Sequence, residues 1–245
     1  MSAEELHRWL DRLADVAQAD FEARSAVRDQ VLQKSRELIR LCSTAIRAGH
    51  RNTWEEAYQL LTQADGVADE MRTLLEPHPD LFYAGYTQDA LKEWVEARLT
   101  LILMKGEVLE AGELSVDLPL QRGVPYDTYL NGLCEAASEL RRRCLDLMRQ
   151  DQMAEAERLL GAMDAVYEIL MSFSHPDAIT GGLRRRVDQL RAVLERTRGD
   201  LTTSQQSERL LRALQLLDPW GEDLSLSPSP RSTVWRGGRG CGWGC

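Results

Sequence analysis

Four glutamates at helical spacing are the residues of this chain best placed to do chemistry. Glu93 and Glu96 are separated by three positions, and Glu135 and Glu139 by four, so each pair projects from one face of a helix. If the two faces meet, three or four carboxylates converge. Such a set of oxygen ligands suits a hard cation, Mg²⁺ or Mn²⁺, with water completing the coordination shell. A cation held there could activate water and stabilise charge on a phosphodiester.

The same spacing also fits acids that merely face solvent. Glu107 and Glu110 form another pair of this kind, and Glu139 is spaced to pair with Arg143. Two like charges on one helix face repel each other, so a basic neighbour or a metal ion should compensate the charge of Glu93 and Glu96. Spacing alone favours the solvent-facing interpretation, and the identity of the compensating cation decides between the two.

Other catalytic chemistries find little support in the sequence. The histidines are far apart, and we expect surface or capping roles for His7, His50, His78 and His175. The nucleophile-elbow, Walker A and dinucleotide-binding motifs do not occur. A di-metal bundle of the ferritin kind would need Glu-x-x-His from two helices, and only Glu4 with His7 fits that pattern.

The two glutamate pairs lie on predicted helices that a long loop separates. The first helix is predicted from Asp80 to Ala111, with a buried stripe at helical spacing that consists of Leu91, Val95, Leu99 and Ile102. Glycines and prolines between Gly112 and Pro125 predict the loop. The second helix is predicted from about Tyr126 to Arg149.

The rest of the chain predicts further helices and no strand. One long helix or two collinear ones begin at a capping box of Ser2 with Glu5, end near His50, and carry a first apolar stripe of Leu6, Leu10, Leu13 and Ala17. A second capping box, Thr53 with Glu56, opens the next helix. Others are predicted over 153–173, over 177–199 with Gly181-Gly182 inside for close packing, and from a cap at Thr203 to about 217. The predicted fold class is all-α: a single-domain bundle of about seven helices over 1–217.

Composition indicates a soluble globular protein. The 245 residues are 43% hydrophobic and 28% charged, and no apolar run approaches the ~20 residues that cross a bilayer. The N-terminus lacks the apolar region of a signal peptide, so we expect a cytoplasmic protein without a membrane partner. Cys42, Cys134 and Cys144 are predicted to be small buried residues. The Ser/Pro/Gly/Trp-rich tail, 218–245, is predicted to be disordered, and Cys241 with Cys245 would make only a weak metal site.

Arginines provide the candidate contacts with nucleic acid. The net charge of −9 weighs against a non-specific polyanion binder, although local distribution matters more than the total. Arginines cluster at 141–143 and 184–186, and the four that we expect to hold phosphates are Arg184, Arg185, Arg186 and Arg191. The alternative is a solvated face of Glu–Arg pairs.

Several blocks of the sequence resemble the translin/TRAX family in its single-chain prokaryotic form. The most specific are KSRELIRLC (Lys34–Cys42), YAGYTQDALKEWVEA (Tyr83–Ala97), YLNGLCEAASELRR (Tyr129–Arg142) and the block from Met163 to Leu201. The blocks follow the family's order, and the resemblance covers about Ser25 to Leu217. It implies an all-α bundle that assembles into an octameric shell and binds single-stranded RNA or DNA. The TRAX branch is a metal-dependent endoribonuclease, whereas the translin branch binds nucleic acid and lacks the acidic site.

Carried over residue by residue, the resemblance implies an acidic metal site of the TRAX type. The Glu-x-x-Glu of TRAX falls on Glu93 and Glu96, and its third acid, an Asp in the family, falls on Glu135, which is one methylene longer. Glu139 matches an acid that non-catalytic members also carry. Thr87-Gln88-Asp89 replaces the basic stretch of translin, which favours the TRAX-like interpretation.

Two functions from different classes are therefore predicted as alternatives. The first is an Mg²⁺-dependent endoribonuclease that acts on single-stranded RNA, with the metal held by Glu93, Glu96 and Glu135 and supported by Glu139. The second is a non-catalytic homo-oligomer that binds single-stranded RNA or DNA. A basic interior behind an acidic exterior would reconcile that binding with the net charge of −9.

Overall fold

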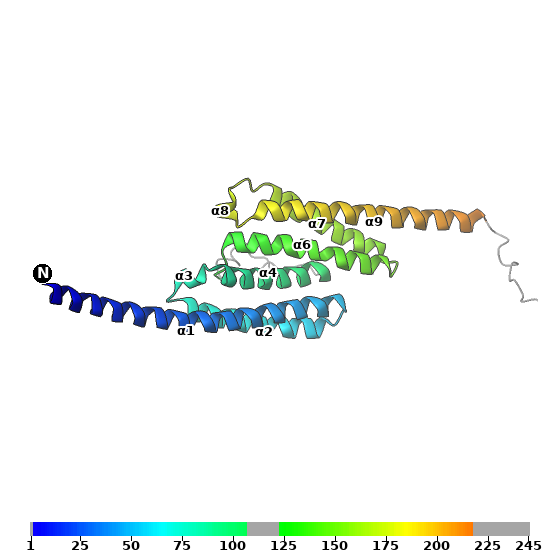
Figure 1. Cartoon of the computed structure of the whole chain (residues 1–245). Helices are drawn as coiled ribbons and strands as arrows, with labels where there is room; N and C mark the ends of the chain where they lie inside the picture. Colours follow the sequence, from blue (N-terminus) through cyan, green and yellow to red (C-terminus); the bar gives the residue numbers. More distant parts are fainter. Residues whose placement is uncertain (1, 107–122, 218–245) are drawn as a thin grey trace, which may run out of the picture. The chain divides into compact units, whose positions relative to one another are not determined.

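A computed structural model describes residues 2–106 and 123–217, and the regular structure in these two ranges is entirely helical (Figure 1). The helices are α1 (Ala3–His50), α2 (Trp54–Leu75), α3 (Pro79–Phe82), α4 (Gly85–Lys105), α6 (Tyr126–Met148), α7 (Met153–Met171), α8 (Asp177–Thr180) and α9 (Leu183–Leu217). The predicted all-α fold class is confirmed. Across the two described ranges, no helix combines the length and apolar character needed to cross a membrane.

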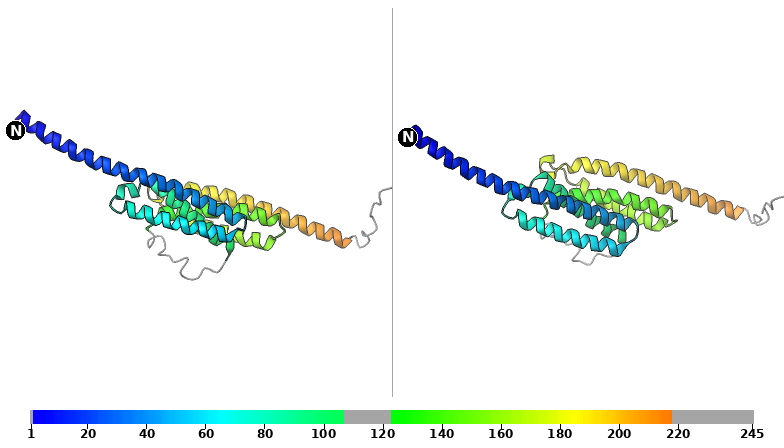
Figure 2. Two further views of the ribbon diagram at one scale, coloured as in Figure 1. Left: turned by 90° about the horizontal axis from the view of Figure 1, so that it is seen from below. Right: turned by 60° about the horizontal axis from the view of Figure 1, so that its bottom comes forward.

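Helix α4 lies at the centre of the packing. It contacts α1 on one side and α6 on the other, while α2 lies along α1 and α7 along α6 (Figure 2). One hydrophobic cluster joins α1, α2 and α4, with Trp94 and Leu91 of α4 almost fully buried. A second cluster joins the end of α4 at Met104 to α6, α7 and the first part of α9. Residues through Gln205 form one compact unit, and Gln206 begins a second unit.

The first half of the chain departs from the sequence prediction at two helix starts. The central helix begins at Gly85 rather than at Asp80, because Ala84 is extended (ψ 143°) and leaves α3 as a separate turn. Thr53 precedes α2 but does not cap it, since its hydroxyl donates to the Ala48 carbonyl oxygen and to Glu56. The capping box of Ser2 with Glu5 is present, and α1 is one continuous helix.

In the second half, the structure has a helix break at Gly181-Gly182, where a continuous helix was predicted, and a continuous helix through Gly199, where an end was predicted. Gly181 and Gly182 adopt positive φ values of 59° and 79°, which end α8 and prevent a continuous helix. Gly199 does not end a helix, since α9 runs through it. The Thr203 hydroxyl donates to the Gly199 carbonyl oxygen inside that helix instead of capping a new one. The short last helix predicted from Thr203 is therefore wrong.

The first apolar stripe of α1 is largely exposed. Leu6, Leu10 and Leu13 are 38%, 44% and 52% exposed, and Trp9 is 52% exposed. Figure 2 shows the N-terminal part of α1 extending past α2 and α3. Burial along α1 begins at Val31, so the bundle packs on its second half only.

Several predictions concern residues outside the described ranges. These are the end of the central helix with Glu107 and Glu110, the loop over 112–122, and the tail over 218–245 with Cys241 and Cys245. The other cysteines, Cys42, Cys134 and Cys144, are buried and free, as predicted.

Gly132 allows α4 and α6 to approach closely. A Cβ atom at this position would lie 2.9 Å from the Lys92 carbonyl oxygen and 2.9 Å from Val95 Cβ, much closer than van der Waals contact. A glycine is therefore required where α6 crosses α4. Glu135 follows one helical turn later on the same face, so the crossing also sets its distance from the acids of α4.

We expect Gly132→Ala to destabilise the protein by about 1–3 kcal/mol, because the added methyl group must push α6 away from the α4 backbone. Gly161→Ala is the matched control, since its Cβ would meet no atom within 4 Å and it lies inside α7. That variant should gain about 0.5–1 kcal/mol from higher helix propensity. Urea unfolding followed by circular dichroism measures both, and equal stability of the two variants would contradict the close crossing.

Candidate functional site

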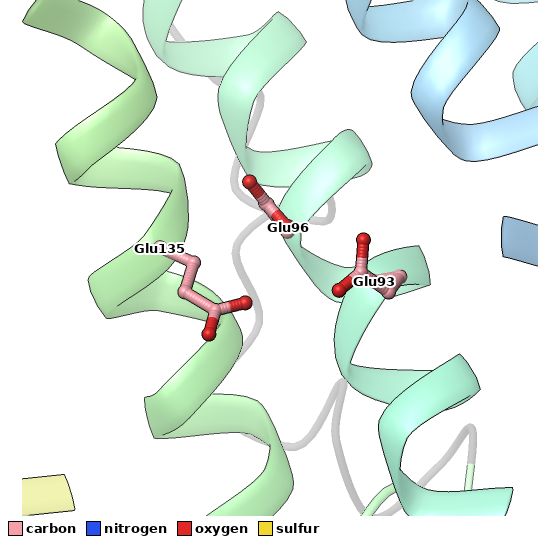
Figure 3. A group of neighbouring side chains, drawn as sticks. All are labelled: Glu93, Glu96 and Glu135. Atoms are coloured by element: carbon pink, nitrogen blue, oxygen red, sulfur yellow. The ribbon is translucent and has the colours of Figure 1, made fainter. Parts of the chain in front are cut away.

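Three of the four predicted glutamates meet between α4 and α6. Glu93 and Glu96 come from α4 and Glu135 comes from α6, and one carboxylate oxygen of each lies within 4.8 Å of those of the other two (Figure 3). All three side chains are half-buried. The two glutamate-bearing faces therefore do meet, and the acids do not simply face open solvent.

Lys92 and Arg186 supply positive charge to this acid cluster. The Lys92 ammonium donates to Glu93 Oε1 at 3.0 Å and also to Glu135 Oε2. Arg186 Nε donates to Glu135 Oε1 at 2.9 Å, and its Nη1 donates to Asn131 Oδ1 and to the Gly181 carbonyl oxygen, both at 3.1 Å. Both oxygens of Glu135 are thus paired with cations. Burial lowers the pKa of Lys92, but its hydrogen bonds to Glu135 and Glu93 outweigh burial and raise the pKa overall.

Glu96 is the acid that these cations leave uncompensated. Within the described ranges it forms no hydrogen bond or ion pair, although Lys92 is near enough to act on it through space. Burial first, and then the charges of Glu93 and Glu135, raise the pKa of Glu96 to about 8. A half-buried carboxylate without a partner, beside two others, attracts a cation strongly.

Glu139, the fourth predicted acid, pairs with a histidine instead of joining the three. His50 Nε2 lies 2.7 Å from Glu139 Oε1, and the His50 side chain is only 2% exposed. The predicted pair of Glu139 with Arg143 is wrong, and so is the surface or capping role predicted for His50. Glu139 still contributes its negative charge to the surroundings of Glu96.

The four arginines proposed to hold phosphates divide into two groups. Arg186 points into the acid cluster and is half-buried. Arg184, Arg185 and Arg191 are exposed on α9, and within the described ranges they make no hydrogen bond or ion pair. These three guanidinium groups are free to bind an anion, whereas Arg186 already has two side-chain partners.

Sequence reasoning missed Lys92, Arg186 and His50 as members of this site. Lys92 directly precedes Glu93, and only three lysines occur in the chain, so its position was a usable signal. The pairing of Arg186 with Glu135 joins residues 51 positions apart, and that of His50 with Glu139 joins residues 89 positions apart. Only the packing of α1 and α9 on the central helices brings these residues together.

The acid cluster suits a hard divalent cation, because its donor atoms are carboxylate oxygens and because these oxygens lie close enough together. Metal–oxygen bonds of about 2.0–2.6 Å place ligand oxygens no more than about 5 Å apart, which the 4.8 Å limit here satisfies. Glu93, Glu96 and Glu135 would be the ligands. The ammonium of Lys92 already contacts two of these three carboxylates, so it competes for the same oxygens.

Comparisons with known proteins identify relatives that match most of the chain. No protein-family profile matches it. An uncharacterised protein of Methanocaldococcus jannaschii is 30% identical over 194 residues, which is 78% of this chain and 82% of that protein.

Three solved structures share the fold. The crystal structure of AfC3PO and its complex with duplex RNA are each 30% identical with a TM-score of 0.71, and they cover 80% of this chain and 98% and 97% of their own. Apo-NeC3PO matches with a TM-score of 0.67 at 17% identity, over 78% of this chain and 96% of its own, which supports the fold alone. C3PO proteins are translin/TRAX proteins, and at 30% identity over most of both chains this chain belongs to the translin family.

Proposed function

We propose that this chain is a metal-dependent endoribonuclease that works as a homo-oligomer. The observation that carries the proposal is the convergence of Glu93, Glu96 and Glu135, with Glu96 lacking a partner within the described ranges. These three residues would hold Mg²⁺ or Mn²⁺. When bound, such an ion would supply Lewis-acid stabilisation of a phosphodiester and a more acidic water molecule.

The remaining residues of the site would orient the acids and bind the RNA. Arg186 holds Glu135 in place through one hydrogen bond, while two further hydrogen bonds, to Asn131 and to the Gly181 carbonyl oxygen, fix the guanidinium of Arg186. His50 fixes the orientation of Glu139. Arg184, Arg185 and Arg191 would bind RNA phosphates along the exposed side of α9, since a guanidinium is a strong phosphate ligand. The AfC3PO complex contains duplex RNA, so both duplex and single-stranded RNA belong in every assay, with single-stranded RNA the substrate that we propose.

A second candidate is a non-catalytic oligomer that binds RNA or single-stranded DNA. Lys92 and Arg186 favour it, because they neutralise Glu93 and Glu135 without a metal. In that case the acid cluster only holds α4, α6 and α9 together. Cleavage assays with and without Mg²⁺ separate the two candidates.

We expect Glu96→Gln to abolish metal binding without unfolding the protein. Glutamine keeps the size of the side chain and resembles the neutral acid that a pKa of about 8 favours without metal near neutral pH, so metal-free stability should stay level. The increase in melting temperature that Mn²⁺ gives the wild type should disappear, because the ion no longer favours the folded state. RNA cleavage should fall at least about 100-fold, as when a group that stabilises developing charge is lost, while RNA binding persists.

The control for this experiment is Glu37→Gln, an exposed glutamate on α1 away from the cluster. It should respond to Mn²⁺ and cleave RNA as the wild type does. If Glu96→Gln cleaves as fast as the wild type at saturating metal, Glu96 has no part in the reaction and the proposed nuclease site is refuted.

RNA affinity should depend on the exposed arginines of α9. For the double variant Arg184→Gln/Arg191→Gln, we expect weaker binding of a single-stranded RNA and a shallower dependence of log K on log salt. The slope should fall by about 1.4, because each contact with a single-strand phosphate contributes about 0.7. Fluorescence anisotropy over a salt series measures it. Arg12→Gln/Arg36→Gln removes two exposed arginines from α1 and should leave the slope unchanged; equal slopes in both variants would place the RNA elsewhere.

We also expect the chain to form a multimer, most simply an octamer. The exposed stripe of Leu6, Trp9, Leu10 and Leu13 is a large apolar surface that water disfavours, which supports burial in an assembly. Light scattering at micromolar concentration should give a mass well above a dimer, near eight times the chain mass of 27.8 kDa. A monomeric or dimeric mass would contradict this part of the proposal.

A further inference from the structure

The Lys92 ammonium contacts two of the three carboxylates that a metal ion would need. The Lys92 side chain is almost buried, 9% exposed as a residue, and its ammonium contacts Glu93 on its own helix and Glu135 on α6. Those two acids are also two of the three candidate metal ligands. A cation that bridges α4 and α6 is therefore built into the chain.

An ammonium group and a divalent cation held by the same carboxylates would repel each other. Their charges of +1 and +2 would lie only a few ångströms apart in a half-buried site, where screening by water is weak. Both oxygens of Glu135 already accept hydrogen bonds from Arg186 and Lys92, so a metal ion bound to Glu135 would have to share an oxygen with one of them. The arrangement therefore favours either the ammonium or the metal on these carboxylates.

On the basis of the proposed metal site, we infer that Lys92 is a resident counter-ion that the metal displaces. Without metal, the Lys92 ammonium neutralises Glu93 and Glu135 and holds the two carboxylates together. When metal binds, the ammonium leaves these carboxylates, and the flexible four-carbon stem of lysine makes that movement possible. Lys92 then sets the metal affinity of the site, because binding must include the loss of its two hydrogen bonds.

Arg186 keeps Glu135 in position while this exchange takes place. It donates to Glu135 Oε1, whereas Lys92 donates to Oε2, so the departure of Lys92 frees one oxygen and leaves the other anchored. The Arg186 guanidinium is itself held by Asn131 and by the Gly181 carbonyl oxygen. The two cations therefore have different roles: Arg186 positions a ligand, and Lys92 competes with the metal.

The first test measures Mn²⁺ affinity of the full chain by calorimetry or by the electron paramagnetic resonance signal of free Mn²⁺. Lys92→Gln should bind Mn²⁺ at least about tenfold more tightly than the wild type, because the competing charge is gone. Lys92→Arg keeps that charge and should bind as weakly as the wild type. Lys34→Gln removes a lysine from an ion pair with Glu70, between α1 and α2, and should leave the affinity unchanged.

The second test follows the wild-type lysine itself, so it does not depend on how well a variant folds. Lys34, Lys92 and Lys105 are the only lysines, so acylation of each can be followed by peptide mass spectrometry. Lys92 should react slowly in metal-free protein, where it is buried and paired, and several-fold faster with saturating Mn²⁺. Lys34 should react equally in both conditions.

The outcomes separate this inference from the proposed function. If the wild type and Lys92→Gln bind Mn²⁺ with the same affinity, or if metal leaves the reactivity of Lys92 unchanged, the counter-ion role is overturned while the metal site stands. If neither protein binds Mn²⁺, the metal site is overturned and the counter-ion role with it. Tighter binding by Lys92→Gln together with faster acylation of wild-type Lys92 supports the inference.

Discussion

The close crossing of α4 and α6 is the constraint on which the acid cluster depends. Gly132 has no side chain, so the backbone of α6 can lie against Lys92 and Val95 of α4. Glu135 is one turn further along α6, which brings its carboxylate to Glu93 and Glu96. The extra methylene of Glu135, compared with the Asp of the TRAX branch, therefore does not prevent the three acids from meeting.

The three neighbouring carboxylates repel one another, and basic side chains of α4 and α9 reduce that repulsion. Three carboxylates within 4.8 Å of one another would repel strongly if all were charged and unpaired. Lys92 and Arg186 neutralise two of them, and the third, Glu96, responds with a pKa raised to about 8. Two of the three carboxylates are thus paired with cations, and the raised pKa keeps Glu96 mainly neutral near neutral pH until a further cation binds.

The sequence was sufficient to predict most of the helices but not the side-chain contacts between them. Apolar spacing correctly indicated helices over α1, α2, α4, α6 and α7 but wrongly divided α9 near Gly199, and the spacing of the glutamates brought Glu93 and Glu96 to one site. It could not show that His50, at the end of α1, would reach Glu139, because that contact depends on how α1 and α6 each pack against α4. Nor could it distinguish Arg186 from Arg184 and Arg185, since three consecutive arginines differ only in which side of α9 faces the bundle.

The local errors have equally physical causes. The predicted continuation through Gly181-Gly182 followed the apolar pattern, but two successive positive φ values override it. The stripe of Leu6, Leu10 and Leu13 has a helical pattern and is helical, yet the pattern cannot reveal whether a neighbour exists to bury it. Periodicity specifies a face, and the partner of that face is a property of the fold or of the assembly.

The position of α9 resolves the apparent conflict between a net charge of −9 and an RNA partner. Near its start, Arg186 turns inward to Glu135, while Arg184, Arg185 and Arg191 remain exposed on the same helix. Under the proposed function, a phosphate backbone bound along these three arginines would lie near the acid cluster, because Arg186 belongs to both the helix and the cluster. Local positive charge would then attract the polyanion to the site while the acidic remainder of the chain repels it elsewhere. The same helix would thus link RNA binding to the carboxylates that a metal requires.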